Sequence, residues 1–144
     1  MDELNAALGL ARAQGGDGFV QETLLAIQRD LVILMGELAT ATEDLARYVK
    51  DGYSVVTQDL TAKLDKVARE IEAQKIDLKG WATPGATPAS AALDLARTVC
   101  RRSERRVCEL EQTLQLNNPE IIIFLNRLSD LLWLMARWVE TKSA

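Results

Sequence analysis

The chain has 144 residues, a net charge of −4 and no histidine, and its 48% hydrophobic content predicts one soluble domain spanning residues 1–144. The acidic pI of 4.9 and the 5% aromatic content argue against a surface that binds nucleic acid, because such surfaces need clustered positive charge and stacking rings. The lack of histidine excludes histidine-assisted nucleophilic catalysis, and no apolar run is long enough to suggest a membrane span.

Two helices are predicted in the first third of the chain. Residues 2–13 have acidic residues at their start and an apolar stripe, and a glycine-rich turn at 15–18 ends them. A longer helix is predicted from Val20 to Val49. Its apolar residues alternate three and four apart, as in helices that pack in bundles: Leu24, Ile27, Leu31, Leu34, Leu38, Ala41 and Leu45.

Three more helices are predicted in the remainder. Thr57 is the expected cap of a third helix, and the Gly- and Pro-containing segment 79–88 is a loop. Thr87 with Pro88, and later Asn118 with Pro119, are typical starts of a fourth and a fifth helix. The buried stripe expected on the fourth helix comprises Ala92, Ala96, Val99, Ser103, Val107, Leu110 and Leu114.

These elements predict an all-α, five-helix bundle. The fifth helix, about Glu120–Glu140, is apolar on more than one side, and this excess of apolar surface favours an oligomer. Cys100 and Cys108 lie eight residues apart on one helix, about 12 Å along its axis, which is too far for a disulfide between them. We therefore expect unpaired thiols and a cytoplasmic protein.

Five arginines fall within ten residues of the fourth helix and form two rows on it. The first row is Arg97, Arg101 and Arg105, and the second is Arg102 and Arg106. Neighbouring like charges repel, so they need carboxylates from other helices or an anionic ligand to offset them. A solvated or salt-bridged face is one interpretation. The other is a phosphate site, because guanidinium groups bind phosphate oxygens in a bidentate way.

Four blocks of sequence also carry a resemblance: residues 2–6 (DELNA), 83–88 (TPGATP), 91–105 (AALDLARTVCRRSER) and 124–130 (FLNRLSD). In their order and spacing they resemble the PduO-type ATP:cob(I)alamin adenosyltransferases, over the whole chain. The resemblance implies a bundle of the cobalamin adenosyltransferase type that forms homotrimers with active sites between subunits. It implies transfer of the 5′-deoxyadenosyl group of ATP to cob(I)alamin with release of triphosphate, and thus ATP, Mg²⁺ and cobalamin as ligands.

The resemblance also implies roles for individual residues. Arg101 is expected to contact triphosphate, Arg97 to pair with Asp2, and Arg102 to contribute to ligand binding. Glu104 lies three residues after Arg101, so it either pairs with that arginine or binds a Mg²⁺ ion that bridges phosphates.

Two residues outside the arginine stretch have alternative interpretations. Asn126 stands where the family has a nucleotide-contacting asparagine, and the alternative is a hydrogen bond between helices. Trp81 stands where the family has an aromatic residue, more usually phenylalanine, that helps to displace the lower axial ligand of the corrinoid. The alternative is an anchor of the loop on the bundle. Arg127 and Asp130, three residues apart, are expected to form a structural salt bridge.

The sequence departs from the family pattern at two places. Family members carry a Gly/Thr/Lys-rich segment that wraps the ATP phosphates ahead of the DELNA block, whereas here Met1 stands directly before Asp2. Asp94 replaces a residue that is often histidine. Two hypotheses therefore stand: a corrinoid adenosyltransferase, or a non-catalytic, N-terminally truncated relative that binds corrinoids or anions or is a structural helical oligomer.

Overall fold

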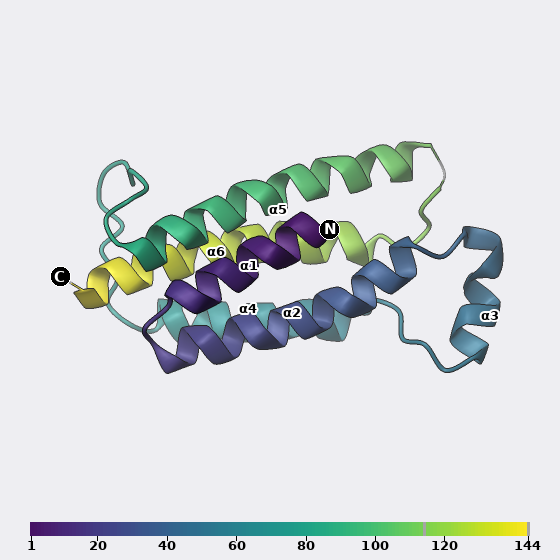
Figure 1. Cartoon of the computed structure of the whole chain (residues 1–144), viewed down its shortest axis with the longest axis horizontal. Helices are drawn as coiled ribbons and strands as arrows, with labels where there is room; N and C mark the ends of the chain where they lie inside the picture. The colour runs from purple at the N-terminus through teal and green to yellow at the C-terminus, as the bar shows by residue number, and fades with distance from the viewer. Residues whose placement is uncertain (114, 144) are drawn as a thin grey trace.

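The computed structural model describes residues 1–113 and 115–143, and within them every regular element is a helix (Figure 1). The predicted all-α class is therefore confirmed. The elements are α1 (Asp2–Gln14), α2 (Gly18–Leu38), the 3₁₀ turn η1 (Thr42–Asp44), α3 (Leu45–Lys50), α4 (Gln58–Glu72), α5 (Pro88–Gln112) and α6 (Glu120–Ser143). None of these helices has the length and apolar character that crossing a membrane requires.

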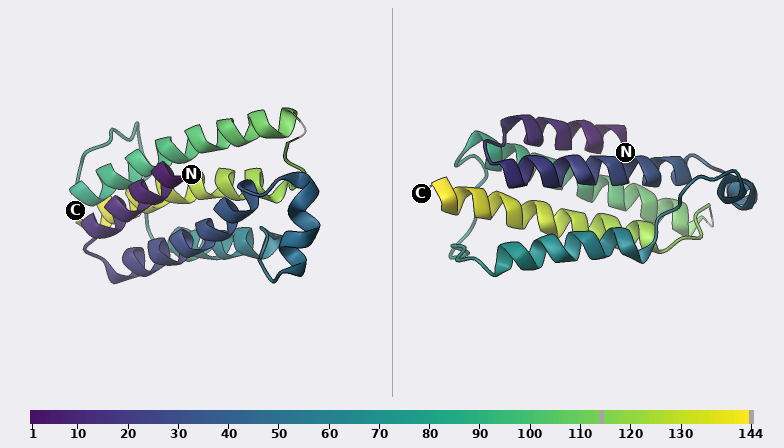
Figure 2. Two further views of the ribbon diagram at one scale, coloured as in Figure 1. Left: turned by 45° about the vertical axis from the view of Figure 1, so that its right-hand side comes forward. Right: turned by 90° about the horizontal axis from the view of Figure 1, so that it is seen from below.

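Five long helices lie alongside one another, and α6 is at their centre (Figures 1 and 2). Helix α6 packs against α5 and α4, while α1 packs against α5 and α2. The turn between α1 and α2, the loop between α4 and α5, and the end of α6 lie at one end of the bundle. Helix α3 lies at the opposite end.

The central position of α6 follows from its sequence, which is apolar on more than one side. Its Phe124, Leu125 and Leu128 are fully buried. The apolar seam of α2 is buried from Leu24 to Leu34, as its spacing predicts. On α5 the predicted stripe is buried or half-buried from Ala92 to Leu110, whereas its last member, Leu114, lies outside the described residues.

The predicted helix starts are confirmed, with one difference in detail. Thr87 and Ser90 form a reciprocal capping box at the start of α5, with Pro88 in the first helical position. Asn118 Oδ1 accepts the N–H of Glu120 at 3.1 Å where α6 begins. Thr57 occupies the N-cap position of α4, but its side chain makes no capping hydrogen bond.

The predicted long helix from Val20 to Val49 is wrong beyond Leu38. The chain turns there and returns through η1 and the short α3, so that six α-helices replace the five expected. The Thr40 hydroxyl donates to the Gly36 carbonyl at 2.8 Å, and the Tyr48 hydroxyl lies where a Cβ on Gly36 would sit. The glycine thus admits a tyrosine from the returning segment, which the seam alone does not reveal.

Candidate functional site

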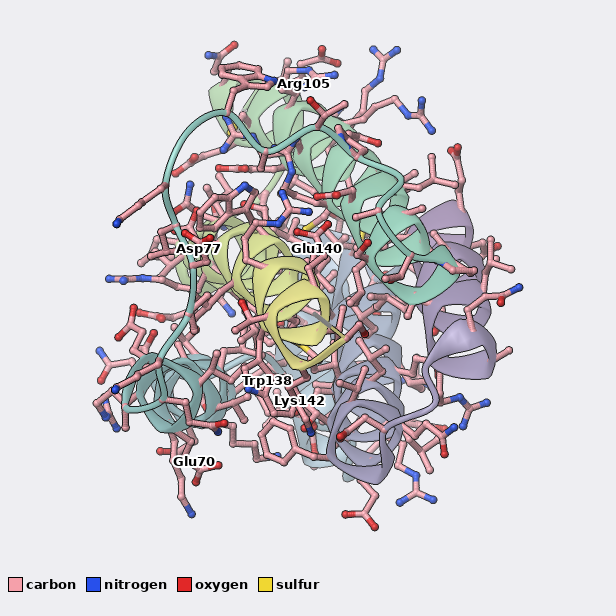
Figure 3. All side chains as sticks on the ribbon, turned by 90° about the vertical axis from the view of Figure 1, so that its left-hand side faces the viewer. Glu70, Asp77, Arg105, Trp138, Glu140 and Lys142 are labelled. Atoms are coloured by element: carbon pink, nitrogen blue, oxygen red, sulfur yellow. The ribbon has the colours of Figure 1, made fainter. Side chains whose placement is uncertain are left out.

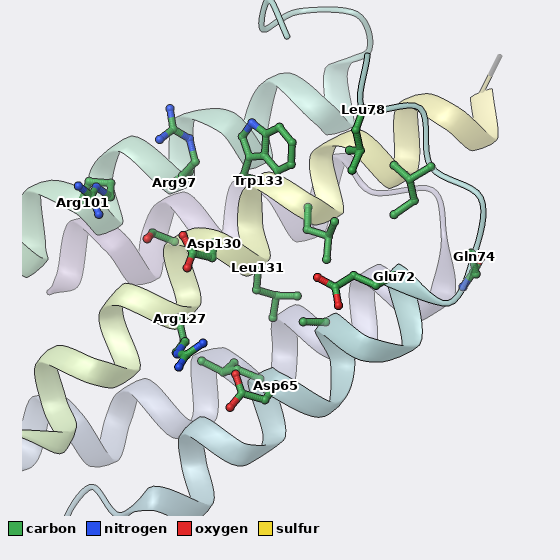
Figure 4. A pocket seen from close by; sticks show the side chains of 15 residues that line it. Asp65, Glu72, Gln74, Leu78, Arg97, Arg101, Arg127, Asp130, Leu131 and Trp133 are labelled. Atoms are coloured by element: carbon green, nitrogen blue, oxygen red, sulfur yellow. The ribbon is translucent and has the colours of Figure 1, made fainter. Parts of the chain in front are cut away.

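A cavity of about 670 Å³ opens between α4, α5, α6 and the segment that follows α4 (Figure 4). Its volume is within the range of sites that hold small molecules. Arg97 and Arg101 reach it from α5, while Asp130 and Trp133 come from α6. The walls combine guanidinium and carboxylate groups with apolar side chains of α4 and α6, so they suit a ligand with an anionic part and a flat apolar part.

Arg101 is held at the cavity wall by a chain of hydrogen bonds between side chains. Its Nη1 donates to Glu104 Oε2 at 3.2 Å, and Glu104 Oε1 accepts from Asn126 Nδ2 at 3.1 Å. The chain of three side chains joins α5 to α6. The Arg101 side chain remains 48% exposed while that of Glu104 is 14% exposed, so the guanidinium is held in place at one side and accessible to a ligand at the other.

The three site residues that this network joins were predicted separately from the sequence. The Asn126 amide of α6 donates a hydrogen bond to Glu104 of α5. This is the hydrogen bond between helices that was one of the two interpretations of Asn126. Neither Asn126 nor Glu104 is among the residues that line the cavity, whereas Arg101 is. The ion pair between Arg101 and Glu104 agrees with the interpretation of Glu104 as a partner of that arginine.

The predicted pairing of Arg97 with Asp2 is not found within the chain. Asp2 is exposed at the first residue of α1, and no ion pair of the described residues joins it to Arg97. Arg97 instead lines the cavity, and its buried Nε has no hydrogen-bond partner. Asp2 belongs to α1, which packs against α5 and α2 and contributes none of the residues that line the cavity.

Arg102 lies on a different side of α5 from the cavity. It forms an ion pair with Glu3 of α1, and both side chains are about half exposed or more. This placement offsets part of the repulsion between the arginine rows. Arg102 therefore does not reach a ligand bound in this cavity, and its predicted contact with a ligand stays a prediction.

Trp81 lies on the loop between α4 and α5 and is 92% exposed. It lines a second, smaller cavity of about 280 Å³ together with Trp133 and Arg137. Because Trp133 also lines the larger cavity, its indole stands between the two spaces. The indole of Trp81 is not packed on the bundle, so the interpretation as a simple apolar anchor does not describe it.

The salt bridge predicted between Arg127 and Asp130 does not form. Both side chains line the larger cavity instead, and no ion pair in the described residues joins them. Three further lining residues escaped the sequence analysis: Asp65, Glu72 and Gln74. No spacing in the sequence distinguishes the two acids of α4, and the packing of α4 on α6 brings them to the cavity.

Cys100 lies next to Arg101 but is no candidate nucleophile. Its Sγ donates to the Leu125 carbonyl at 3.2 Å inside the core. Burial, and then the nearby Glu104 carboxylate, raise the pKa of this thiol to about 12. It therefore stays protonated at neutral pH, and both cysteines are unpaired, as expected.

Both carboxylate oxygens of Glu104 accept hydrogen bonds from nitrogen donors, and its role as a Mg²⁺ ligand stays a prediction. Among the described residues, no cluster of three or more Asp, Glu, Cys or His side chains is placed to hold a metal ion. We therefore derive no step through a metal bound by Glu104.

Comparison with known sequences identifies the group of proteins to which this site belongs. The model of the family described as cobalamin adenosyltransferase matches residues 1–139. A corrinoid adenosyltransferase of Bacillus subtilis is 35% identical over 147 residues, which cover 99% of this chain and 72% of the relative. One from Citrobacter freundii is 36% identical over 141 residues, covering 98% of this chain and 77% of the relative.

Solved structures agree with this fold. A variant PduO-type ATP:corrinoid adenosyltransferase from Lactobacillus reuteri, complexed with cobalamin and ATP, superimposes with a TM-score of 0.86 at 27% identity. The match covers 99% of this chain and 77% of that protein. The family match, the identity to the two bacterial relatives and the common fold together give one conclusion: this chain belongs to the cobalamin adenosyltransferase family.

Proposed function

We propose that this protein transfers the 5′-deoxyadenosyl group of ATP to the cobalt of cob(I)alamin. The corrinoid adenosyltransferases to which it is similar support this activity. The observation on this chain that carries the proposal is the position of Arg101 at the cavity, fixed by Glu104 and still exposed. A cavity with such an arginine at its wall suits a nucleotide whose triphosphate must be neutralised.

In the proposed reaction the cobalt of the reduced corrinoid supplies the electron pair. A bond forms between cobalt and the C5′ atom of ATP, the bond between C5′ and the triphosphate oxygen breaks, and its electrons leave with the triphosphate. The step therefore needs no side-chain nucleophile, which agrees with a chain without histidine and with a protonated Cys100. The protein must align the two substrates and stabilise the negative charge that develops on the leaving group.

Arg101 is suited to stabilising the leaving group. Its contact with Glu104 restricts the side chain, so less conformational freedom is lost when the guanidinium binds a phosphate oxygen. Arg97 is the second guanidinium at the cavity, and its unpartnered Nε leaves it a hydrogen bond to donate. We propose that Arg97 and Arg101 together face the polyphosphate.

For the corrinoid we propose the side of the site where Trp81 and Trp133 lie. The exposed indole of Trp81 presents a flat apolar surface at the mouth of the smaller cavity, and Trp133 continues it toward the larger one. A corrin ring is a broad ring system with an apolar face, so two indoles are a suitable surface for it. The nucleotide and the corrinoid would then meet between the arginines and the tryptophans.

Three finer features belong to the same proposal. We propose a homotrimer with sites between subunits, a cytoplasmic location, and Mg²⁺ carried by ATP phosphates rather than by Glu104. We also propose that tight ATP binding requires a phosphate-wrapping segment ahead of Asp2, as the resemblance implies. Light scattering tests the trimer, and ATP titration of this chain with and without such a segment fused to its start tests the segment.

The direct test is formation of adenosylcobalamin from chemically reduced cobalamin and ATP, followed by the visible absorption of the corrinoid. We expect product, and we expect Trp81→Ala to raise the KM for the corrinoid. Tyr53→Ala is a matched control, because Tyr53 is another exposed aromatic residue and follows α3 by three residues in the chain. Helix α3 lies at the opposite end of the bundle from the loop of Trp81. Corrinoid binding without any product, also with the fused segment, would instead support the non-catalytic alternative.

A further inference from the structure

The loop that carries Trp81 is attached to the last turns of α6 by two hydrogen bonds. The Trp138 indole Nε1 donates to Gln74 Oε1 at 2.9 Å. The backbone N–H of Asp77 donates to the Thr141 hydroxyl at 3.3 Å. Trp138 and Thr141 are three residues apart, so they are neighbours on α6 and present both groups to the same segment.

Trp138 is a rigid partner for this loop. Its side chain is buried, and its ring meets the Phe19 ring edge to face at a centroid distance of 5.3 Å. The Lys142 ammonium lies 4.4 Å from the indole centroid and pairs with Asp17 at the start of α2. Trp138 and Lys142 are both labelled in Figure 3. The indole N–H therefore has a fixed direction, set by contacts on α2 and α6.

The loop has few other attachments. Between residues 75 and 86, the bond from Asp77 to Thr141 is the one hydrogen bond to the bundle that the described residues make. Gly80 and Gly85 adopt positive φ angles of 77° and 112°, so the backbone there has conformations that other residues rarely take. Ile76, which packs partly buried against the core, lies between Gln74 and Asp77. The position of Trp81 thus depends on how the segment from Gln74 to Asp77 is held on the bundle.

The two residues through which the segment bonds to α6, Gln74 and Asp77, both line a cavity. Gln74 lines the larger cavity, and Asp77 and Thr141 line the smaller one with Trp81. A change in either hydrogen bond would therefore move a wall of the site without altering Arg101. This geometry separates the loop side of the site from its arginine side.

We propose that Trp138 and Thr141 are positioning residues that hold the Trp81 loop in the conformation required for corrinoid binding. The corrinoid part of this inference rests on the proposed function. The structural part, that these two residues restrain the loop, stands without it. Loss of one net hydrogen bond is expected to change the loop equilibrium about three- to tenfold.

The test uses two variants that each remove one hydrogen-bonding group, and of the two only Thr141→Val also keeps the side-chain shape. Trp138→Phe keeps an aromatic ring against Phe19 but lacks the indole N–H, and Thr141→Val lacks the hydroxyl that accepts from Asp77. Ser143→Ala is the matched control, because its hydroxyl is on the same helix end and bonds only to the Val139 carbonyl. Amide hydrogen exchange of residues 74–83 is measured in the unliganded protein, with α5 as internal reference.

We expect exchange in 74–83 to become about three- to tenfold faster in Trp138→Phe and Thr141→Val, and unchanged in Ser143→Ala and in α5. In the adenosylation assay the KM for the corrinoid should rise by a similar factor, while the KM for ATP stays within about twofold. A variant that only weakens the fold would accelerate exchange in every helix. It would not raise the KM for the corrinoid more than the KM for ATP.

Three outcomes would overturn the inference. Unchanged exchange in both variants would mean that they do not restrain the loop. Faster exchange throughout the bundle would mean that their role is general stability. Faster loop exchange with an unaltered corrinoid KM would remove the link to the substrate. If the unsubstituted protein forms no adenosylcobalamin, the proposed function fails, and the exchange result still decides whether the loop is held by α6.

Discussion

Asp94 of α5 and Arg137 of α6 form an ion pair in the interior of the bundle, with 2.6 Å between Oδ2 and Nη2. Their side chains are only 5% and 4% exposed. Arg137 also lies 3.0 Å from Glu140 and 5.6 Å from the centroid of the Trp133 ring. Asp94 departs from the residue that the family resemblance leads one to expect, and its carboxylate neutralises Arg137 rather than the arginines of the cavity.

We expect Asp94→Leu to destabilise the protein strongly. Removing Asp94 leaves the buried Arg137 with Glu140 as its remaining charged partner, and breaking a buried pair typically costs about 3–5 kcal/mol. The double variant Asp94→Leu/Arg137→Met, which removes both charges, should recover most of that loss. Urea unfolding gives both free energies. Glu109→Gln breaks an exposed pair with Arg106 and should change stability by less than about 1 kcal/mol.

Arg101→Lys is expected to lower the rate of adenosylation about 10²–10³-fold, because lysine keeps the charge but loses the bidentate guanidinium. Unfolding stability should barely change, since lysine is also a good helix former and the pair with Glu104 is partly exposed. The assay and thermal unfolding are measured on the same variant. A lower melting temperature with no effect on the rate would assign Arg101 to the scaffold alone.

Asn126→Ala should act through Glu104 rather than through the substrate. Loss of the 3.1 Å hydrogen bond leaves Glu104 less restricted, and Arg101 with it, so we expect kcat to fall about two- to tenfold. In a double-mutant cycle with Arg101→Lys, the two effects should be less than additive, because both act on the same guanidinium. Full additivity would show that Asn126 contributes independently, for example by touching the nucleotide.

The sequence predicts the helices well where local signals determine them. The apolar periodicity and the caps at Thr87 and Asn118 place α1, α4, α5 and α6 within a few residues. The end of α2 at Leu38 could not be predicted in this way, since the apolar seam continues beyond it. The turn depends on a tertiary contact, the approach of Tyr48 to Gly36, which no periodicity encodes.

The site also has residues that local sequence signals predict and residues that only tertiary contacts bring together. Arg97 and Arg101 are recognisable because their spacing puts them on one side of a single helix, and both reach the cavity. The hydrogen bond from Trp138 to Gln74 joins residues 64 positions apart, and no local pattern in the sequence indicates it. Arg127 and Asp130 have the spacing of a salt bridge, but the cavity beside α6 provides other directions for both side chains.

Asp17 gives a prediction with a defined pH dependence. Its side chain caps α2 by accepting the N–H groups of Phe19 and Val20, and it pairs with Lys142 at the end of α6. The hydrogen bond from Lys142 is the main reason that the pKa of this carboxyl lies below its usual value of 3.8. Since the folded state releases the proton more readily than the unfolded chain, the pair stabilises the protein above about pH 4. This stabilisation is lost as the pH falls from 3.8 through the lower pKa of the folded state.

Asp17→Asn tests this pairing, because asparagine is an equally good N-cap and only the charge is lost. Near pH 7 the variant should be less stable by about 0.2–1 kcal/mol, a small value because Lys142 is 48% exposed. The difference in melting temperature should shrink toward zero as the pH falls below the lowered pKa of Asp17 in the folded state, and 1 M salt should reduce it at pH 7. Lys142→Met should show the same pH dependence with a larger loss, since it also removes the cation from the Trp138 ring. A difference that is independent of pH would mean that Asp17 acts as a cap alone, and that α2 and α6 are not joined by charge.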